Sequence, residues 1–166
     1  MAEQVPVWAD VFSAIQAELE AVTNTAGGPA FADVIQGEPI GLPLGGPYAC
    51  FWYLGRTDAS GGATFGNIMY AARIQIMCLW PMRAERETLG AWEADIATID
   101  TSIRRRFRAN SVINSNLTDL DILDSQVSYG DLPSSQAAPG TSARNLYRVL
   151  QMELRLDNLE GEAIAA

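Results

Sequence analysis

The stretch Asn67 to Trp80, NIMYAARIQIMCLW, decides the fold. Every second position from Ile68 to Trp80 is apolar, and the positions between them include Arg73 and Gln75. Because successive side chains of a strand point to opposite faces, this alternation predicts a long strand with one fully covered face and one partly covered face. The stretch is shorter than the roughly 20 apolar residues that cross a bilayer, so we expect no membrane span.

A long amphipathic helix is predicted after this strand, over Glu85 to Asn110. Its apolar residues recur every three or four positions, as one face of a helix requires; they are Leu89, Trp92, Ile96, Ile99, Ile103 and Phe107. The charges follow the helix dipole, with Glu85 and Glu87 near the start and an arginine cluster near the end. This arginine cluster consists of Arg104, Arg105, Arg106 and Arg108. We expect Asn110 to cap the helix in a left-handed conformation.

The same patterns predict the remaining elements. They are a helix over Val7 to Val22 and strands over Phe31 to Gln36, Tyr48 to Arg56, Leu117 to Tyr129 (with an irregularity at Asp124) and Leu146 to Leu156. The expected fold is a single α+β domain, one mixed or antiparallel sheet of about five strands with the two helices packed on one face, in the order α-β-β-β-α-β-β. This domain spans residues 1–166, with its core over about 5–156 and residues 157–166 as a loose tail.

Two helices can cover only one face of such a sheet. The opposite face keeps Met69 and Met77 from the long strand and Tyr147 and Val149 from the last strand. An exposed apolar patch of this kind is typical of a partner interface. We therefore predict an interface at these residues, together with the arginine cluster.

The residue types that are missing exclude many activities. The chain has no histidine, and all 11 of its basic residues are arginines. It therefore lacks a Ser-His-Asp triad, a Cys-His pair, a His-ligated zinc site, a P-loop lysine and a Schiff-base lysine. We expect no enzyme activity, no catalytic residue and no cofactor. Cys50 and Cys78 form no CxxC motif, and we expect both to be reduced and buried.

The charge and the amino-terminal sequence indicate where the chain acts. A net charge of -9 argues against nucleic-acid binding, because phosphate contacts depend on Lys and Arg. The first residues, MAEQVPVWADVF, lack the basic and apolar regions of a secretory signal. We therefore expect a protein that is made in a cytoplasm and stays there.

Two polar clusters leave alternatives open. Asp119, Asp121 and Asp124 have the residue type that binds divalent cations, but the alternation of a strand places the first two on one face and the third on the other. A solvated edge strand is the favoured interpretation, and no metal site is predicted. The arginine cluster is explained by the helix dipole, by ion pairs with a neighbouring subunit, or by nucleic acid, in that order of preference.

The order and spacing of several segments carry a family resemblance. After the amphipathic first helix come GEP at Gly37 to Pro39, ACFWY at Ala49 to Tyr53, and the long strand and long helix; LTDLDIL at Leu117 to Leu123 and LYRVLQMEL at Leu146 to Leu154 complete the pattern. Through these segments the chain resembles the tail terminator family of long-tailed bacteriophages, and more closely its actinobacteriophage branch. The resemblance covers roughly residues 5 to 156.

This resemblance implies a structural virion protein of the neck, at the head-proximal end of the tail, assembled in the bacterial cytoplasm. Such a protein forms a homohexameric ring that caps the tail tube, ends tube polymerisation and provides a docking surface for the head-side connector. The implied partners are further copies of the chain, the major tail-tube protein and the connector or stopper protein. DNA passes through the lumen without specific binding, and no membrane is involved.

Other functions remain open beside this one. A head-tail connector or stopper protein would share the composition. A carboxylate-metal enzyme built on Asp119 and Asp121 is a distant alternative, and a small-molecule binding module is more distant still, for want of a polar cluster in an apolar pocket.

Overall fold

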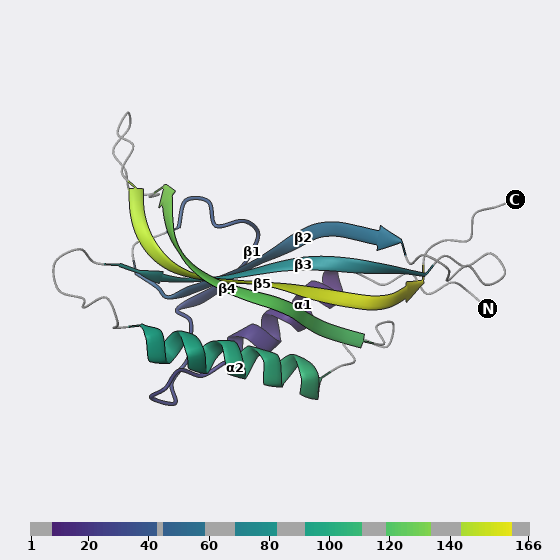
Figure 1. The fold of residues 1–166 in the computed structure, drawn as a ribbon, viewed down its shortest axis with the longest axis horizontal. Coiled ribbons are helices and arrows are strands. Elements are labelled where there is room, and N and C mark those ends of the chain that lie inside the picture. The colour runs from purple at the N-terminus through teal and green to yellow at the C-terminus, as the bar shows by residue number, and fades with distance from the viewer. Residues whose placement is uncertain are drawn as a thin grey trace, which may run out of the picture.

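Two helices and five strands make up the described part of the chain, in the predicted order (Figure 1). The computed structural model describes residues 8–42, 45–58, 69–82, 92–110, 119–133 and 144–160. The elements are α1 (Trp8–Glu20), β1 (Asp33–Gln36), β2 (Tyr48–Asp58), β3 (Met69–Pro81), α2 (Glu93–Ala109), β4 (Asp119–Pro133) and β5 (Arg144–Glu160). The predicted α+β class and element order are confirmed.

The strands form one open, mixed sheet in the order β1-β2-β3-β5-β4. β1 runs parallel to β2, and the other neighbouring pairs are antiparallel. β1 and β4 therefore lie at opposite edges, and β3 lies at the centre. A central strand is covered on both faces more than an edge strand is, which fits the strongly apolar sequence of β3.

Both helices pack on the same face of the sheet, as predicted (Figure 1). α1 packs against β1, and α2 packs against β4. The main core lies between the helices and the sheet. Its members from the helices and from β3 are all buried: Val11, Ile15, Leu19, Ile96, Ile99, Ile103, Phe107, Ala72, Ile74, Ile76, Cys78 and Trp80. The residues that the alternation of β3 assigned to one face thus meet the apolar faces of both helices.

Polar contacts fix the start of α2. Asp95 accepts hydrogen bonds from the backbone N–H and the hydroxyl of Thr25, at 3.2 and 2.5 Å. Glu93 pairs with Arg148 of β5 at 3.0 Å. Glu93 and Asp95 are the two acidic residues of the first described turn of α2, and both are held by contacts with other segments. The predicted start of this helix, with Glu85 and Glu87, lies outside the described residues.

The end of α2 differs from the prediction. Asn110 has a φ of -110° and is not left-handed. Its backbone N–H donates to the carbonyl of Arg106, and its side-chain amide donates to Glu18 of α1 at 2.8 Å. A carboxylate from the neighbouring helix thus holds Asn110, and a local left-handed turn is not needed.

β5 extends further than predicted, whereas β4 contains the predicted irregularity. Asp157–Glu160, which we expected in a loose tail, extend β5, because the first residues of β3 supply a partner as far as Met69 opposite Glu160. Residues 161–166 of the expected tail lie outside the described part. The irregularity predicted at Asp124 is confirmed by a shift of register between Ile122 and Ser125.

Candidate interaction surfaces

The sheet face opposite the helices, here called the second face, is sealed at one end by the chain itself. A smaller apolar cluster lies there, made of Leu42, Tyr48, Cys50, Leu79, Tyr147 and Val149. Tyr147 is 2% exposed and Val149 is 4% exposed. The prediction that these two residues form an exposed interface is therefore wrong.

The reason is the Pro/Gly-rich segment after β1, which the sequence analysis did not place. Leu42 from this segment is buried among the side chains of the cluster. Met77 packs against the cluster and is partly buried. The side chain of Met69 lies outside the described part. The apolar patch predicted on the second face is thus mostly an internal core.

Beyond this cluster and the partly buried Ile35 and Trp52 that also pack against it, the second face of β3 and β5 carries polar side chains. Gln75 is buried and donates a hydrogen bond from Nε2 to the carbonyl of Met152 at 2.9 Å. Beside it, Arg73 of β3 donates two hydrogen bonds to the carboxylate of Glu153 on β5, at 2.6 and 2.8 Å. This contact lowers the pKa of Glu153 and raises the pKa of Arg73. A face that ends in a bidentate ion pair offers a partner little apolar surface.

The arginine cluster divides into two pairs of different roles. Arg104 pairs with Asp100 one turn earlier in α2, at 3.1 Å, and Arg106 pairs with Glu18 of α1 at 3.0 Å. These two arginines are thus engaged within the chain. Arg105 and Arg108 are exposed, and within the described residues no carboxylate pairs with either. Within the arginine cluster, Arg105 and Arg108 therefore remain as candidates for contact with a partner subunit.

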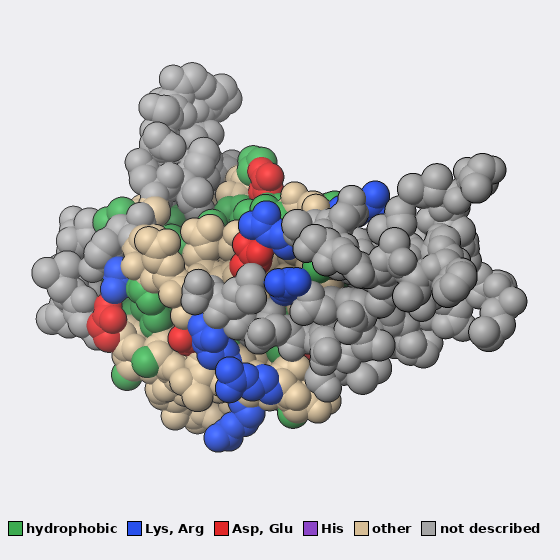
Figure 2. Space-filling view, turned by 45° about the vertical axis from the view of Figure 1, so that its right-hand side comes forward, with side chains coloured by type: hydrophobic (Ala, Val, Ile, Leu, Met, Phe, Trp, Pro, Cys, Tyr) green, Lys and Arg blue, Asp and Glu red, His purple; other side chains and the backbone are tan. Residues whose placement is uncertain are grey.

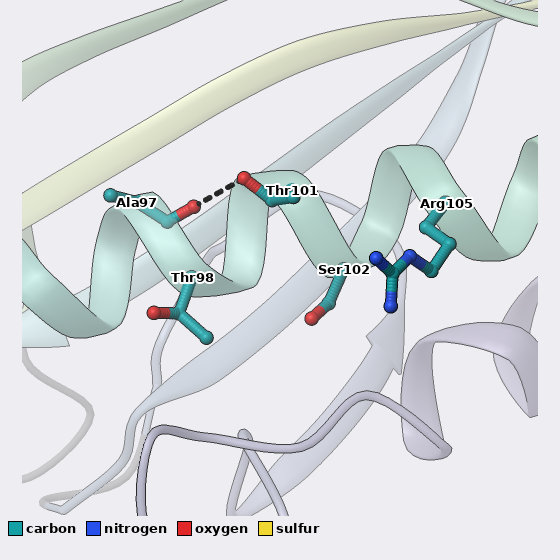
Figure 3. A pocket seen from close by; sticks show the side chains of 5 residues that line it. All are labelled: Ala97, Thr98, Thr101, Ser102 and Arg105. Carbon is teal, nitrogen blue, oxygen red and sulfur yellow. Dashed lines mark hydrogen bonds between the residues drawn. The ribbon is translucent and has the colours of Figure 1, made fainter.

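A shallow hollow of about 450 Å³ lies along the outer side of α2 (Figure 3). It is lined by Ala97, Thr98, Thr101, Ser102 and Arg105. Thr98, Ser102 and Arg105 project to the same side of the helix in Figure 3, whereas the Thr101 hydroxyl donates back to the carbonyl of Ala97 at 2.9 Å. With hydroxyls, one guanidinium and no carboxylate, this surface suits a hydrogen-bonding partner of negative charge.

Acids and the arginine cluster are carried by different elements of the described part. The charged residues of the first described segment, 8–42, are all acidic: Asp10, Glu18, Glu20, Asp33 and Glu38. This segment contains α1 and the edge strand β1. The arginine cluster belongs to α2, which packs on β4 at the other edge. Figure 2 shows arginine side chains gathered at the lower side of the molecule, where α2 lies in Figure 1.

The sequence contains the signal for this uneven distribution of charge. The first arginine of the chain is Arg56, so no basic side chain precedes it. What the sequence could not supply is the placement of α1 and α2 over opposite edges of one sheet. That placement turns a charge pattern along the chain into a charge pattern across the molecule.

The remaining candidate residues offer no chemical site in the described part. Cys50 and Cys78 are free and buried, as predicted. Burial raises the pKa of Cys50 to about 11 and also raises that of Cys78, which keeps both thiols protonated. Among the described side chains no three His, Cys, Asp or Glu residues come together in a way that would hold a metal ion. The side chains of Asp119, Asp121 and Asp124 lie outside the described part.

Comparison with known proteins assigns no family. No protein-family model matches the chain, and no curated protein sequence does so either. Among the described residues, neither helix combines the length and the apolar character needed to span a bilayer.

Proposed function

We propose that this chain is a structural protein of a bacteriophage tail, a terminator that caps the tail tube as an oligomeric ring. It ends tube polymerisation and presents a docking surface to the head-side connector. The observation that carries the proposal is the order of the elements. The segments behind the family resemblance fall in α1, after β1, in β2, in β3, in α2 and in the paired strands β4 and β5, in the sequence that the resemblance requires.

The electrostatics support the same function. A net charge of -9 makes a ring of such subunits repel the DNA backbone, so that DNA passes through the lumen without being held. Four of the 11 arginines that oppose this charge are clustered in α2. A protein whose task is to contact other proteins needs no catalytic residue set, and we assign it none.

Tube assembly tests the proposal directly. Purified chain is added to tail-tube subunits from the same phage as they polymerise, and tube lengths are measured by electron microscopy. We expect short tubes of uniform length with extra density at one end. An unrelated acidic protein of similar size is the control, and tubes of unchanged length with no bound chain would overturn the proposal.

The same experiment separates the terminator from the alternative neck protein. If the chain ignores tube subunits and instead binds the portal-side adaptor of the head, it acts as a connector or stopper. Pull-down of each purified partner on the immobilised chain distinguishes the two.

A further inference from the structure

Two surfaces of the molecule have opposite charge, and one belongs to α2, which packs on β4, while the other belongs to β1 at the opposite edge of the sheet. One is the outer side of α2, where Arg105 and Arg108 are exposed and have no acidic partner within the described residues. The other is the β1 edge, defined here as β1 and the residues after it up to Gly41. No basic residue occurs in this second surface.

The β1 edge also exposes an apolar side chain beside its acids. Glu38 is exposed, and Ile40 is 76% exposed, the most exposed of the large hydrophobic side chains described. The backbone here is held in place, because Gly37 N–H donates to the carbonyl of Phe51 at 2.8 Å and so continues the pairing of β1 with β2. An exposed isoleucine next to a carboxylate on a fixed backbone forms a contact of defined shape and charge.

We infer that these two surfaces bind each other between copies of this chain, with Arg105 and Arg108 of one subunit lying against Glu38 and Ile40 of the next. The inference rests on the proposed function, since a ring cap requires identical copies to associate, and it names the surfaces that do so. The hydroxyls of Thr98 and Ser102 beside Arg105 supply hydrogen-bond donors for the same contact.

The charges also determine the symmetry of this contact. A two-fold axis through either surface brings that surface against its own copy, so arginines would face arginines or carboxylates would face carboxylates. Like charges placed together weaken such an arrangement. A two-fold contact that instead pairs the outer side of α2 with the β1 edge would need both surfaces on one side of the subunit. A head-to-tail contact brings opposite charges together and leaves one surface of each kind free at the two ends. Further copies therefore add in the same way, and the assembly closes into a ring when the rotation between neighbouring subunits allows it.

Cysteine cross-linking tests both the surfaces and the symmetry. Ser102→Cys beside Arg105 and Gln36→Cys on the β1 edge, which keep Arg105 and Glu38, are made singly and together, and each protein is treated with a short bis-maleimide at about 1 mM protein, with and without tail-tube protein. The native thiols are a low background, because Cys50 and Cys78 are buried. Thermal unfolding of each variant checks that it is folded.

The expected result is a ladder of covalent dimers, trimers and longer species from the double variant only. A mixture of the two single variants should stop at dimers, because each chain then offers one reactive end. High salt should reduce the ladder at least about fivefold, because the contact is electrostatic. Dimers formed by Ser102→Cys alone would reveal a two-fold contact and overturn the inference, as would the absence of a ladder under both conditions.

Charge reversal provides an independent measurement. Arg105→Glu and Glu38→Arg change the net charge in opposite directions, yet each should abolish association, measured by light scattering with tube protein present. The chain with both replacements should regain association in part, since the pair at positions 105 and 38 is then reversed while Arg108 is unchanged. If the chain caps tubes but the charge reversals do not change its association, the proposed function stands and this interface is wrong. If the charge reversals act as expected but the chain does not bind tubes, the interface stands and the proposed function is wrong.

Discussion

Arg106 at the end of α2 donates a hydrogen bond from Nε to Oε2 of Glu18 on α1 over 3.0 Å. The other carboxylate oxygen, Oε1, accepts from the side chain of Asn110 at 2.8 Å. One carboxylate of α1 therefore holds the last turn of α2. No backbone hydrogen bonds of a sheet join the two helices, so this side-chain contact holds the end of α2 against α1. It also explains why Arg106 is engaged within the chain.

Removing this carboxylate should loosen the helix pair. Glu18→Ala is expected to lower the free energy of unfolding by about 1 kcal/mol, because two charge-assisted hydrogen bonds are lost at a site that is only partly buried. Glu18→Gln keeps an acceptor and should lose less. Urea denaturation measures both. Glu20→Ala, two residues away and exposed, is the matched control, and an equal loss there would show that the Arg106 contact contributes nothing.

Gly130 on β4 is expected to be intolerant of any side chain. A Cβ at this position would lie 2.9 Å from Cγ2 of Val149, closer than real Cβ contacts. Val149 is buried in the apolar cluster of the second face, so it cannot move away freely. Gly130→Ala should therefore cost about 1 to 3 kcal/mol of unfolding free energy.

A double-mutant cycle separates this clash from a general loss of strand stability. In the Val149→Ala background, Gly130→Ala should cost markedly less, because the atom that it strikes is gone. Thermal or urea unfolding of the four proteins gives the coupling. Additive losses would mean that the clash does not occur.

The sequence predicted what depends on local periodicity. The alternation of β3 placed Ile74, Ile76 and Trp80 on the helix side, and the three-to-four spacing of α2 placed Ile99 and Phe107 against them. Both patterns are fixed by backbone geometry, since each side chain's direction follows from its position in the element. The fold class and the element order followed from them.

The sequence did not predict what depends on contacts between distant segments. Periodicity shows which side chains share a face, but not which loop covers that face, so Tyr147 and Val149 were assigned to the surface. Arg106 was predicted to contact another subunit, because the residue that it actually pairs with, Glu18, lies on the other helix. Both errors have the same origin, since the covering residue and the pairing residue come from the first 42 residues of the chain.

The buried thiol of Cys50 should make stability depend on alkaline pH. Burial raises its pKa from 9.0 to about 11, so the folded state keeps a proton that the unfolded state releases first. The contribution of this group is fully present below pH 9.0 and is lost as the pH rises through about 11.

Cys50→Ala isolates this effect, because Cys78 is retained in both proteins. The difference in unfolding free energy between wild type and Cys50→Ala should shrink as the pH is raised above 9.0. Urea titrations at a series of pH values measure it. A difference that stays constant over this range would show that the thiol titrates alike in the folded and unfolded states.

Leu42 and Ile40 lie two residues apart and should behave in opposite ways. Leu42 is 3% exposed in the apolar cluster of the second face, whereas Ile40 is 76% exposed. Leu42→Ala should lower the unfolding free energy by about 2 to 5 kcal/mol, the range for deleting a buried leucine side chain. It should also increase binding of a hydrophobic dye, because the second face is then less covered.

Ile40→Ala is the matched control and should leave both measurements nearly unchanged, since an exposed side chain contributes little to folding. Its effect should appear only in association between subunits. If Leu42→Ala were as stable as Ile40→Ala, the segment after β1 would not seal the second face. Tyr147 and Val149 would then be accessible, and the sheet face itself would replace the α2 side and the β1 edge as the surface offered to a partner.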